Sequence, residues 1–163
     1  ECQSGVVEVS KLMVRLAEMP AVGRGFIERL TMPEIESPAW TSPASADTRR
    51  VAVVSTAAVS RRGDKPFSWH ARDYRVIPKD ERDLVMTHIA VEYDRTAWQQ
   101  DLNAIMPLDR LEEMASAGEI GSVAKEHYTF LGSSDPAEMK RYVADVADRM
   151  RADDVNTVFL IPV

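Results

Sequence analysis

Short apolar runs alternate along this chain with polar segments of helical periodicity. Three runs are rich in β-branched residues, which is typical of strands buried on both faces of a sheet, and they span residues 51–59, 84–91 and 157–163. Apolar residues at helical spacing follow Asp135-Pro-Ala-Glu138, a capping box that predicts the start of a helix. Similar spacing predicts two short helices before Pro33 and another from Leu108 to a stop at Gly118.

Strands that alternate with helices predict an α/β fold with a mainly parallel sheet, because parallel neighbours need long crossover connections. We expect a three-layer sandwich of Rossmann-like or flavodoxin-like type, with helices on both faces of the sheet. Pro33, Pro38 and Pro43 lie among serine, alanine and threonine, which favours an extended N-terminal arm. Within one folded unit, we therefore expect an N-terminal helical segment and arm over residues 1–48 and an α/β domain over residues 49–163.

Composition narrows the classes of function. A net charge of −6 and an isoelectric point of about 5.1 argue against binding to nucleic acid or to acidic membranes. Neither a membrane-spanning apolar run nor a signal-peptide pattern is present, so we expect a soluble, cytoplasmic protein. Cys2 is the only cysteine, so one chain can form no internal disulfide. The chain begins at Glu1 and stops at Val163 inside a predicted strand, so we expect both ends to be cut.

Several segments together carry a resemblance to a known family. In chain order they are Val51-Ala-Val-Val-Ser-Thr-Ala57 with Arg62-Gly-Asp-Lys-Pro-Phe67, Tyr74-Arg-Val-Ile-Pro78, Asp101-Leu-Asn103 with Pro107-Leu-Asp-Arg-Leu111, and Gly118-Glu-Ile-Gly-Ser-Val-Ala124. From Met13 onward, their order and spacing resemble the selenoprotein B family of glycine, sarcosine, betaine and D-proline reductases. The chain resembles a partial member of that family or a cysteine-poor relative.

The resemblance implies a reductase subunit that cleaves a carbon–nitrogen bond in a small amino-acid-like substrate, with cysteine or selenocysteine as nucleophile. It also implies that a segment with this nucleophile follows a strand like residues 158–163, where the sequence ends; Cys2 lies outside the matched region. The implied partners are the substrate and other reductase subunits, and an open sheet edge favours a homo-oligomer. Two other hypotheses are a non-catalytic subunit that docks a catalytic chain and, ranked lowest, a stand-alone hydrolase or isomerase.

Candidate binding residues lie near the predicted strand ends, where open α/β sheets bind ligands. Ser55 and Thr56 end the first strand, and they either bind substrate or form a hydrogen-bonded strand exit. Arg62 and Arg75 belong to a basic stretch over residues 61–79. They either hold a substrate carboxylate, which suits the planar guanidinium group, or form a solvated charged surface.

His88, with Asp94 and Asp101, is the acid–base candidate, because a histidine can protonate a leaving amine while a carboxylate fixes its tautomer. The alternatives are a core-edge histidine bonded to backbone for His88 and a helix cap for Asp101. We expect no metal site, because His70, His88 and His127 form no short ligand motif. We also expect no cofactor, because the glycine-rich nucleotide-binding motifs are missing.

Overall fold

The computed structural model describes residues 16–29, 41–89, 95–132 and 134–163. The chain divides into two compact units, Glu1–Met32 and Pro33–Val163. In the first unit, the described residues form a short 3-10 helix, η2 (Leu16–Glu18), and α1 (Ala21–Glu28). The second of the two predicted N-terminal helices is therefore confirmed, whereas the first falls almost wholly outside the described residues.

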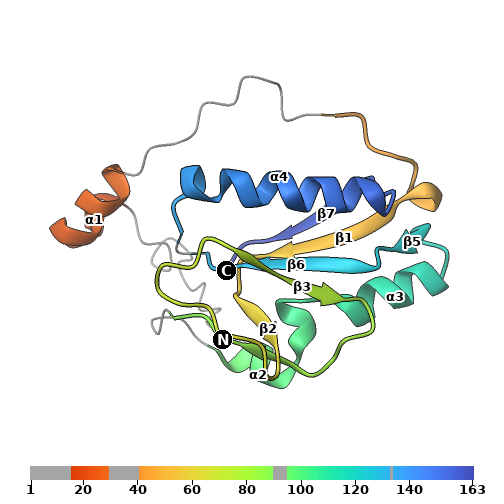
Figure 1. Cartoon of the computed structure of the whole chain (residues 1–163), viewed down its shortest axis with the longest axis horizontal. Helices are drawn as coiled ribbons and strands as arrows, with labels where there is room; N and C mark the ends of the chain where they lie inside the picture. Colours follow the sequence, from red (N-terminus) through yellow and green to blue (C-terminus); the bar gives the residue numbers. More distant parts are fainter. Residues whose placement is uncertain (1–15, 30–40, 90–94, 133) are drawn as a thin grey trace, which may run out of the picture. The chain divides into compact units, whose positions relative to one another are not determined.

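The second unit is built on a five-stranded sheet (Figure 1). Its strands are β1 (Arg50–Ser55), which follows the 3-10 helix η3 (Ala46–Thr48), β3 (Tyr74–Pro78), β5 (Ser122–Val123), β6 (Glu126–Phe130) and β7 (Thr157–Ile161). Strand β7 runs parallel to β1 along almost its whole length. On the other edge of β1, β5 pairs in parallel with its start and β6 with its end, while β3 pairs antiparallel with β6. The sheet is therefore mainly parallel, which confirms the predicted α/β class.

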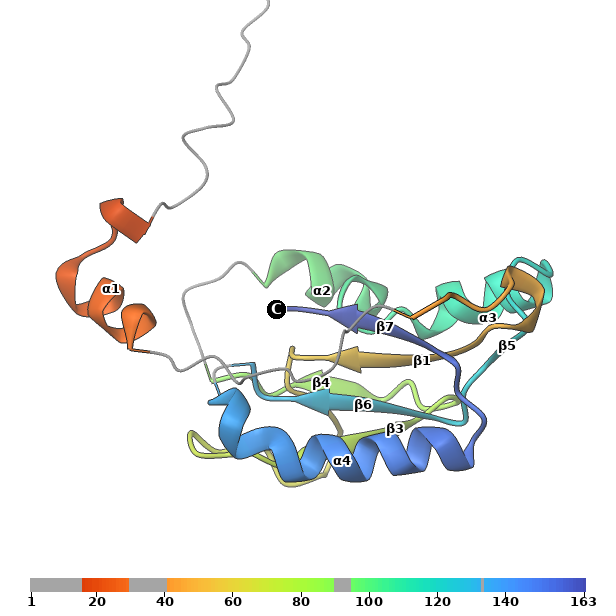
Figure 2. The ribbon, with the colours of Figure 1, turned by 90° about the horizontal axis from the view of Figure 1, so that it is seen from above.

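Helices cover both faces of this sheet (Figure 2). Helix α4 (Pro136–Ala152) lies on one face, where its Val146 and Met150 pack in one cluster with Tyr128 of β6. The other face carries α2 (Thr96–Gln100), the 3-10 helix η4 (Leu102–Ala104) and α3 (Leu108–Ser116). Apolar side chains of α3 share a cluster with Val53 and Ile77 of the sheet. The connection that leads to β5 therefore covers one face of the sheet, and the connection from β6 to β7 covers the other.

The apolar run over residues 51–59 forms two strands rather than one. Strand β1 ends at Ser55, and the chain turns away at Ala58, whose φ of 51° lies in the left-handed region. The remainder enters β2 (Val59–Arg61), which pairs antiparallel with β4 (Leu84–Met86) in a separate two-stranded sheet. Val59 stays buried because this small sheet packs on the α2 and η4 side of the molecule.

Local signals at the two long helices act as the sequence indicates. The Asp135 carboxylate accepts the N–H of Ala137 at 2.8 Å, and Pro136 occupies the first turn, where its missing N–H is not needed. After α3, Gly118 adopts a φ of 75°, a conformation that glycine reaches without strain. Both predicted helices of this unit are confirmed.

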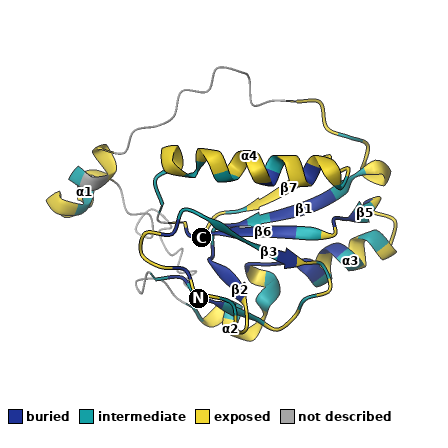
Figure 3. Cartoon of the chain, in the orientation of Figure 1, coloured by how far each residue is buried: buried dark blue, intermediate teal, exposed yellow. Residues whose placement is uncertain are grey.

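The last strand departs from its prediction. Residues 157–163 have the composition of a strand buried on both faces, but β7 lies at the edge of the sheet, and Val158, Phe159 and Leu160 are exposed (Figure 3). Leu160 has 67% of its surface exposed. Within the described residues, one edge of β7 pairs with β1 and the other pairs with no strand.

Arg50 and Asn156 fasten the start of β1 to the end of α4 and to β7. The Arg50 guanidinium bonds the Asp153 carboxylate through Nη2 at 2.7 Å and donates through Nη1 to the Val123 carbonyl at 3.0 Å. The Asn156 side chain accepts the Arg50 N–H at 2.9 Å and donates to the Thr48 carbonyl at 3.0 Å. These side chains thereby form hydrogen bonds with main-chain groups that have no partner in the hydrogen bonds between strands.

Candidate functional site

The carboxyl ends of three parallel strands meet at one end of the main sheet, which we call its carboxyl edge. Strand β1 ends at Ser55, β6 at Phe130 and β7 at Ile161. Because β3 is antiparallel and Tyr74 at its start pairs with Phe130, the loop that precedes β3 reaches the same edge. Helix α4 starts there too, since it follows β6. In open α/β sheets this edge is where ligands usually bind.

Ser55 and Thr56 lie at this edge, with their hydroxyl groups bonded within the chain. Ser55 is fully buried, and its Oγ accepts the N–H of Ala57 at 3.2 Å. Thr56 Oγ1 accepts the N–H of Val163 at 2.8 Å and donates to the carbonyl of Val163 at 3.3 Å. These bonds are those of a strand exit, and they join the ends of β1 and β7.

Arg62 and Arg75 line two different cavities. Arg62 is ion-paired with Asp83 at 2.8 Å and lines a cavity of about 500 Å³ together with Arg82 and Trp98. Arg75 lines a different cavity, of about 250 Å³, at the carboxyl edge. The structure therefore does not bring the two arginines into one pocket.

The smaller cavity is rich in cationic side chains, and we call it the basic pocket. Ser134 Oγ donates to the Ala71 carbonyl at 2.7 Å and so ties the loop before β3 to the start of α4, between which the pocket opens. Its polar lining consists chiefly of Lys65, His70, Arg72, Asp73, Arg75 and Arg141. Four permanent cations thus face one carboxylate in a chain that is acidic overall. Such a local excess of positive charge favours an anionic ligand.

His88 is buried just after β4, with 6% of its surface exposed. Its main-chain carbonyl accepts a hydrogen bond from Arg95 Nη2 at 3.2 Å. Asp94, its predicted carboxylate partner, lies outside the described residues. Burial at a strand end suits either interpretation of His88, as a core-edge residue or as a proton donor to a shielded substrate.

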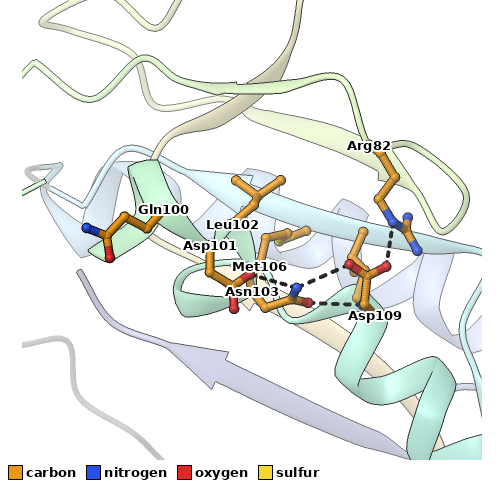
Figure 4. Close-up of a pocket in the computed structure, with 8 residues that line it drawn as sticks. Arg82, Gln100, Asp101, Leu102, Asn103, Met106 and Asp109 are labelled. Atoms are coloured by element: carbon orange, nitrogen blue, oxygen red, sulfur yellow. Dashed lines mark hydrogen bonds and ion pairs between the residues drawn. The ribbon is translucent and has the colours of Figure 1, made fainter. Parts of the chain in front are cut away.

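Asp101, the third acid–base candidate, belongs to a capping network in a different cavity of about 350 Å³ (Figure 4). Its carboxylate accepts the N–H and the side-chain amide of Asn103, each at 2.9 Å. Asn103 in turn accepts the Asp109 N–H and donates to the Asp109 carboxylate, which pairs with Arg82 at 2.7 Å. Hydrogen bonds from Asn103 lower the pKa of both carboxyl groups, and Arg82 adds to the effect at Asp109. These polar groups largely satisfy one another.

His127 lies in an environment that strongly disfavours its protonated form, which the sequence did not indicate because β6 was not among the predicted strands. The side chain is fully buried, and Nδ1 accepts the Val53 N–H at 3.0 Å where a strand carbonyl would ordinarily do so. Within the described residues Nε2, which must carry the proton, has no hydrogen-bond partner. Burial lowers the pKa of His127 to about 4.

Over residues 16–29, 41–89, 95–132 and 134–163, no group of three or more histidine, cysteine, aspartate or glutamate side chains could hold a metal ion. No helix in the described part of the chain is both long and apolar enough to cross a membrane.

Comparison with known proteins gives one family and one curated relative. The family model described as glycine/sarcosine/betaine reductase selenoprotein B matches residues 21–162. The D-proline reductase subunit gamma of Acetoanaerobium sticklandii is 26% identical over 148 residues, which cover 85% of this chain and 59% of the relative. The chain thus spans less than two thirds of that relative's length. No solved structure matches the chain.

Proposed function

Because the chain belongs to the glycine/sarcosine/betaine reductase selenoprotein B family, we propose that it is a reductase subunit that binds a small amino-acid-like substrate for reductive cleavage of a carbon–nitrogen bond. The substrate carboxylate binds in the basic pocket, which Arg75 lines. The observation that carries this proposal is the excess of cations over carboxylates at the carboxyl edge of the parallel strands. Guanidinium and ammonium groups are suitable partners for a carboxylate, and the position suits a ligand of an α/β sheet.

Substrate binding by the isolated chain tests the proposal. Isothermal titration with glycine, betaine and D-proline should give saturable binding that weakens at high salt, because the attraction is between charged groups near the surface. The matched control ligand is ethylamine, which carries an amine but no carboxylate and should not bind. Equal binding of ethylamine and glycine, or no binding of any carboxylate-bearing ligand, would contradict the proposal.

Cleavage also requires a nucleophile and a proton for the leaving amine. We assign the nucleophile to a thiol or selenol of the reductase outside the described residues, and the proton to His88, oriented by Asp94 rather than by Asp101, whose carboxylate is bonded to Asn103 in another cavity. In a complete reductase, His88→Ala should therefore lower turnover by about 100-fold or more, the usual contribution of a general acid. Unchanged turnover in a variant with unchanged circular dichroism would remove this role from His88.

A second candidate function, a non-catalytic assembly subunit, is favoured by strand β7. This edge strand exposes Val158, Phe159 and Leu160 and carries no charged residue, so a partner chain could extend the sheet there. Light scattering of the chain mixed with the other subunits of its reductase distinguishes the two candidates. A stable complex, together with no amino-acid binding by the chain or by the complex, would favour assembly alone.

A further inference from the structure

The basic pocket contains two cationic side chains that form no ion pair with a carboxylate of the described residues, and we infer that these two, Lys65 and Arg141, form its anion-binding subsite. Arg141 comes from the second turn of α4, and Lys65 from the loop before β3. This subsite specifies where the proposed substrate binds. That its anion is the carboxylate of an amino-acid-like substrate rests on the proposed function. Lys65 and Arg141 thus take the place of Arg62, which lines a different cavity, and of Arg75 as the cations that hold the anion.

Four hydrogen bonds already engage the guanidinium group of Arg75. Its Nη1 pairs with Asp73 at 2.8 Å and donates to the Tyr74 carbonyl at 3.0 Å, while Nε and Nη2 donate to the Lys65 carbonyl at 3.3 and 3.2 Å. The guanidinium carbon also lies 4.3 Å from the centre of the Phe67 ring. Arg75 therefore forms a wall of the pocket and positions Lys65 through its backbone, but it has little capacity left for a ligand.

Arg72 is neutralised in a similar way. Its Nε pairs with the Glu138 carboxylate, and its Nη1 donates to the Ala71 carbonyl at 3.3 Å and to Ser134 Oγ at 3.5 Å. The charges of Arg72 and Arg75 are thus each balanced by one carboxylate. A ligand would have to displace Glu138 or Asp73 to use either of them.

Arg141 is oriented by Tyr142 rather than by a carboxylate. Its guanidinium carbon lies 4.5 Å from the centre of the Tyr142 ring, and Nη2 donates to the Tyr142 hydroxyl at 2.5 Å. Stacking on an aromatic ring orients a guanidinium group while Nε and Nη1 stay available. Across the described residues, neither Arg141 nor the Lys65 ammonium group forms an ion pair with a carboxylate.

The dimensions of the pocket limit its ligand to a small molecule. A cavity of about 250 Å³ lies below the range of about 300–1,000 Å³ that is typical of drug-sized ligands. Its lining is predominantly polar, with Ala71, Pro66 and the Tyr142 ring as its main apolar surfaces. A small carboxylate with a short polar body fits this combination, whereas a long apolar or nucleotide ligand does not.

The test follows anion binding directly at Arg141 by NMR of a chain with ¹⁵N-labelled arginine side chains. Acetate is the probe for the subsite alone, and glycine and D-proline are the probes for the proposed substrate class. Arg141→Gln and Lys65→Gln should each weaken the binding of acetate and glycine by about tenfold or more, as expected for loss of one charge-assisted partner. Arg62→Gln, which removes an exposed arginine of another cavity, should change binding by less than about twofold.

The possible outcomes separate the subsite from the proposed function. If glycine binds and neither Arg141→Gln nor Lys65→Gln weakens it, the subsite is overturned while substrate binding stands. If acetate binds through Arg141 but no amino acid does, the subsite stands and the proposed function fails. If neither acetate nor any amino acid binds, both are overturned. Circular dichroism of each variant shows that lost binding does not reflect a lost fold.

Discussion

Replacing His127 by asparagine is expected to make the stability of the chain less sensitive to acid. His127 is fully buried on β6, where Nδ1 accepts the Val53 N–H. Burial, assisted by the positive charge of Arg82, lowers the pKa of His127 from 6.5 to about 4, although the Asp153 carboxylate acts in the opposite direction. An asparagine Oδ1 can accept the same N–H and does not titrate in this range.

The direction of the effect follows from the lowered pKa. Between pH 6.5 and about 4, the unfolded chain takes up a proton on this histidine that the folded chain does not bind. The free energy of unfolding therefore decreases as the pH falls through that window, by about 3 kcal/mol in total, because each pKa unit corresponds to about 1.4 kcal/mol. The asparagine variant should lack this decrease. Urea unfolding of both proteins across the window measures it, and parallel pH profiles would refute the prediction.

Arg50→Met is expected to destabilise the fold by about 2–4 kcal/mol, because it removes a cationic partner of the mostly buried Asp153 carboxylate and the donor to the Val123 and Asp153 carbonyl groups. Only 22% of the Arg50 side chain is exposed, and 15% of its partner Asp153. Burial on its own would raise the pKa of Asp153, but the Lys125 N–H and the Arg50 guanidinium together hold it below the usual value. The loss should appear as a lower midpoint of urea unfolding with an unchanged slope.

Arg62→Met is the matched control for this prediction. Arg62 forms an ion pair of similar length, 2.8 Å with Asp83, but 66% of its side chain is exposed. Exposed pairs contribute little, so this variant should lose less than about 1 kcal/mol. Equal losses in the two variants would mean that burial of the Arg50 network does not determine its contribution.

The features that the sequence predicts correctly are those set by neighbouring residues. Helix α4 begins at Pro136 because Asp135 caps it, and α3 ends before Gly118 because glycine adopts the required positive φ. These signals depend on residues a few positions apart, so they can be recognised without knowledge of the tertiary structure. The alternation of such helices with apolar runs also gave the α/β class.

The features that the sequence misses depend on residues far apart in the chain. Residues 126–130, with histidine, tyrosine, threonine and phenylalanine in succession, form β6 between β3 and β1, although no uniform apolar run marks them. The exposure of β7 could not be predicted either, because composition does not show whether a strand lies at the centre or the edge of a sheet.

The candidate site shows the same division. Arg62 and Arg75 are close in sequence, but they lie at opposite ends of a loop and line different cavities. Arg141 lies on α4, outside the basic stretch over residues 61–79, and it lines the same pocket as Lys65 only because α4 meets the loop before β3. A basic stretch could thus indicate anion binding, but it could not identify which cations remain available.

The pairing of β1 with β7 has a consequence for synthesis of the protein. Asn156, which accepts the Arg50 N–H, follows it by 106 residues, so β7, the neighbour on that side of β1, leaves the ribosome after the other strands of the sheet. Until then the nascent chain exposes one edge of β1, and it can gain the Arg50 network only once the segment around Asp153 has emerged. The five-stranded sheet can therefore complete its folding only after β7 has been translated.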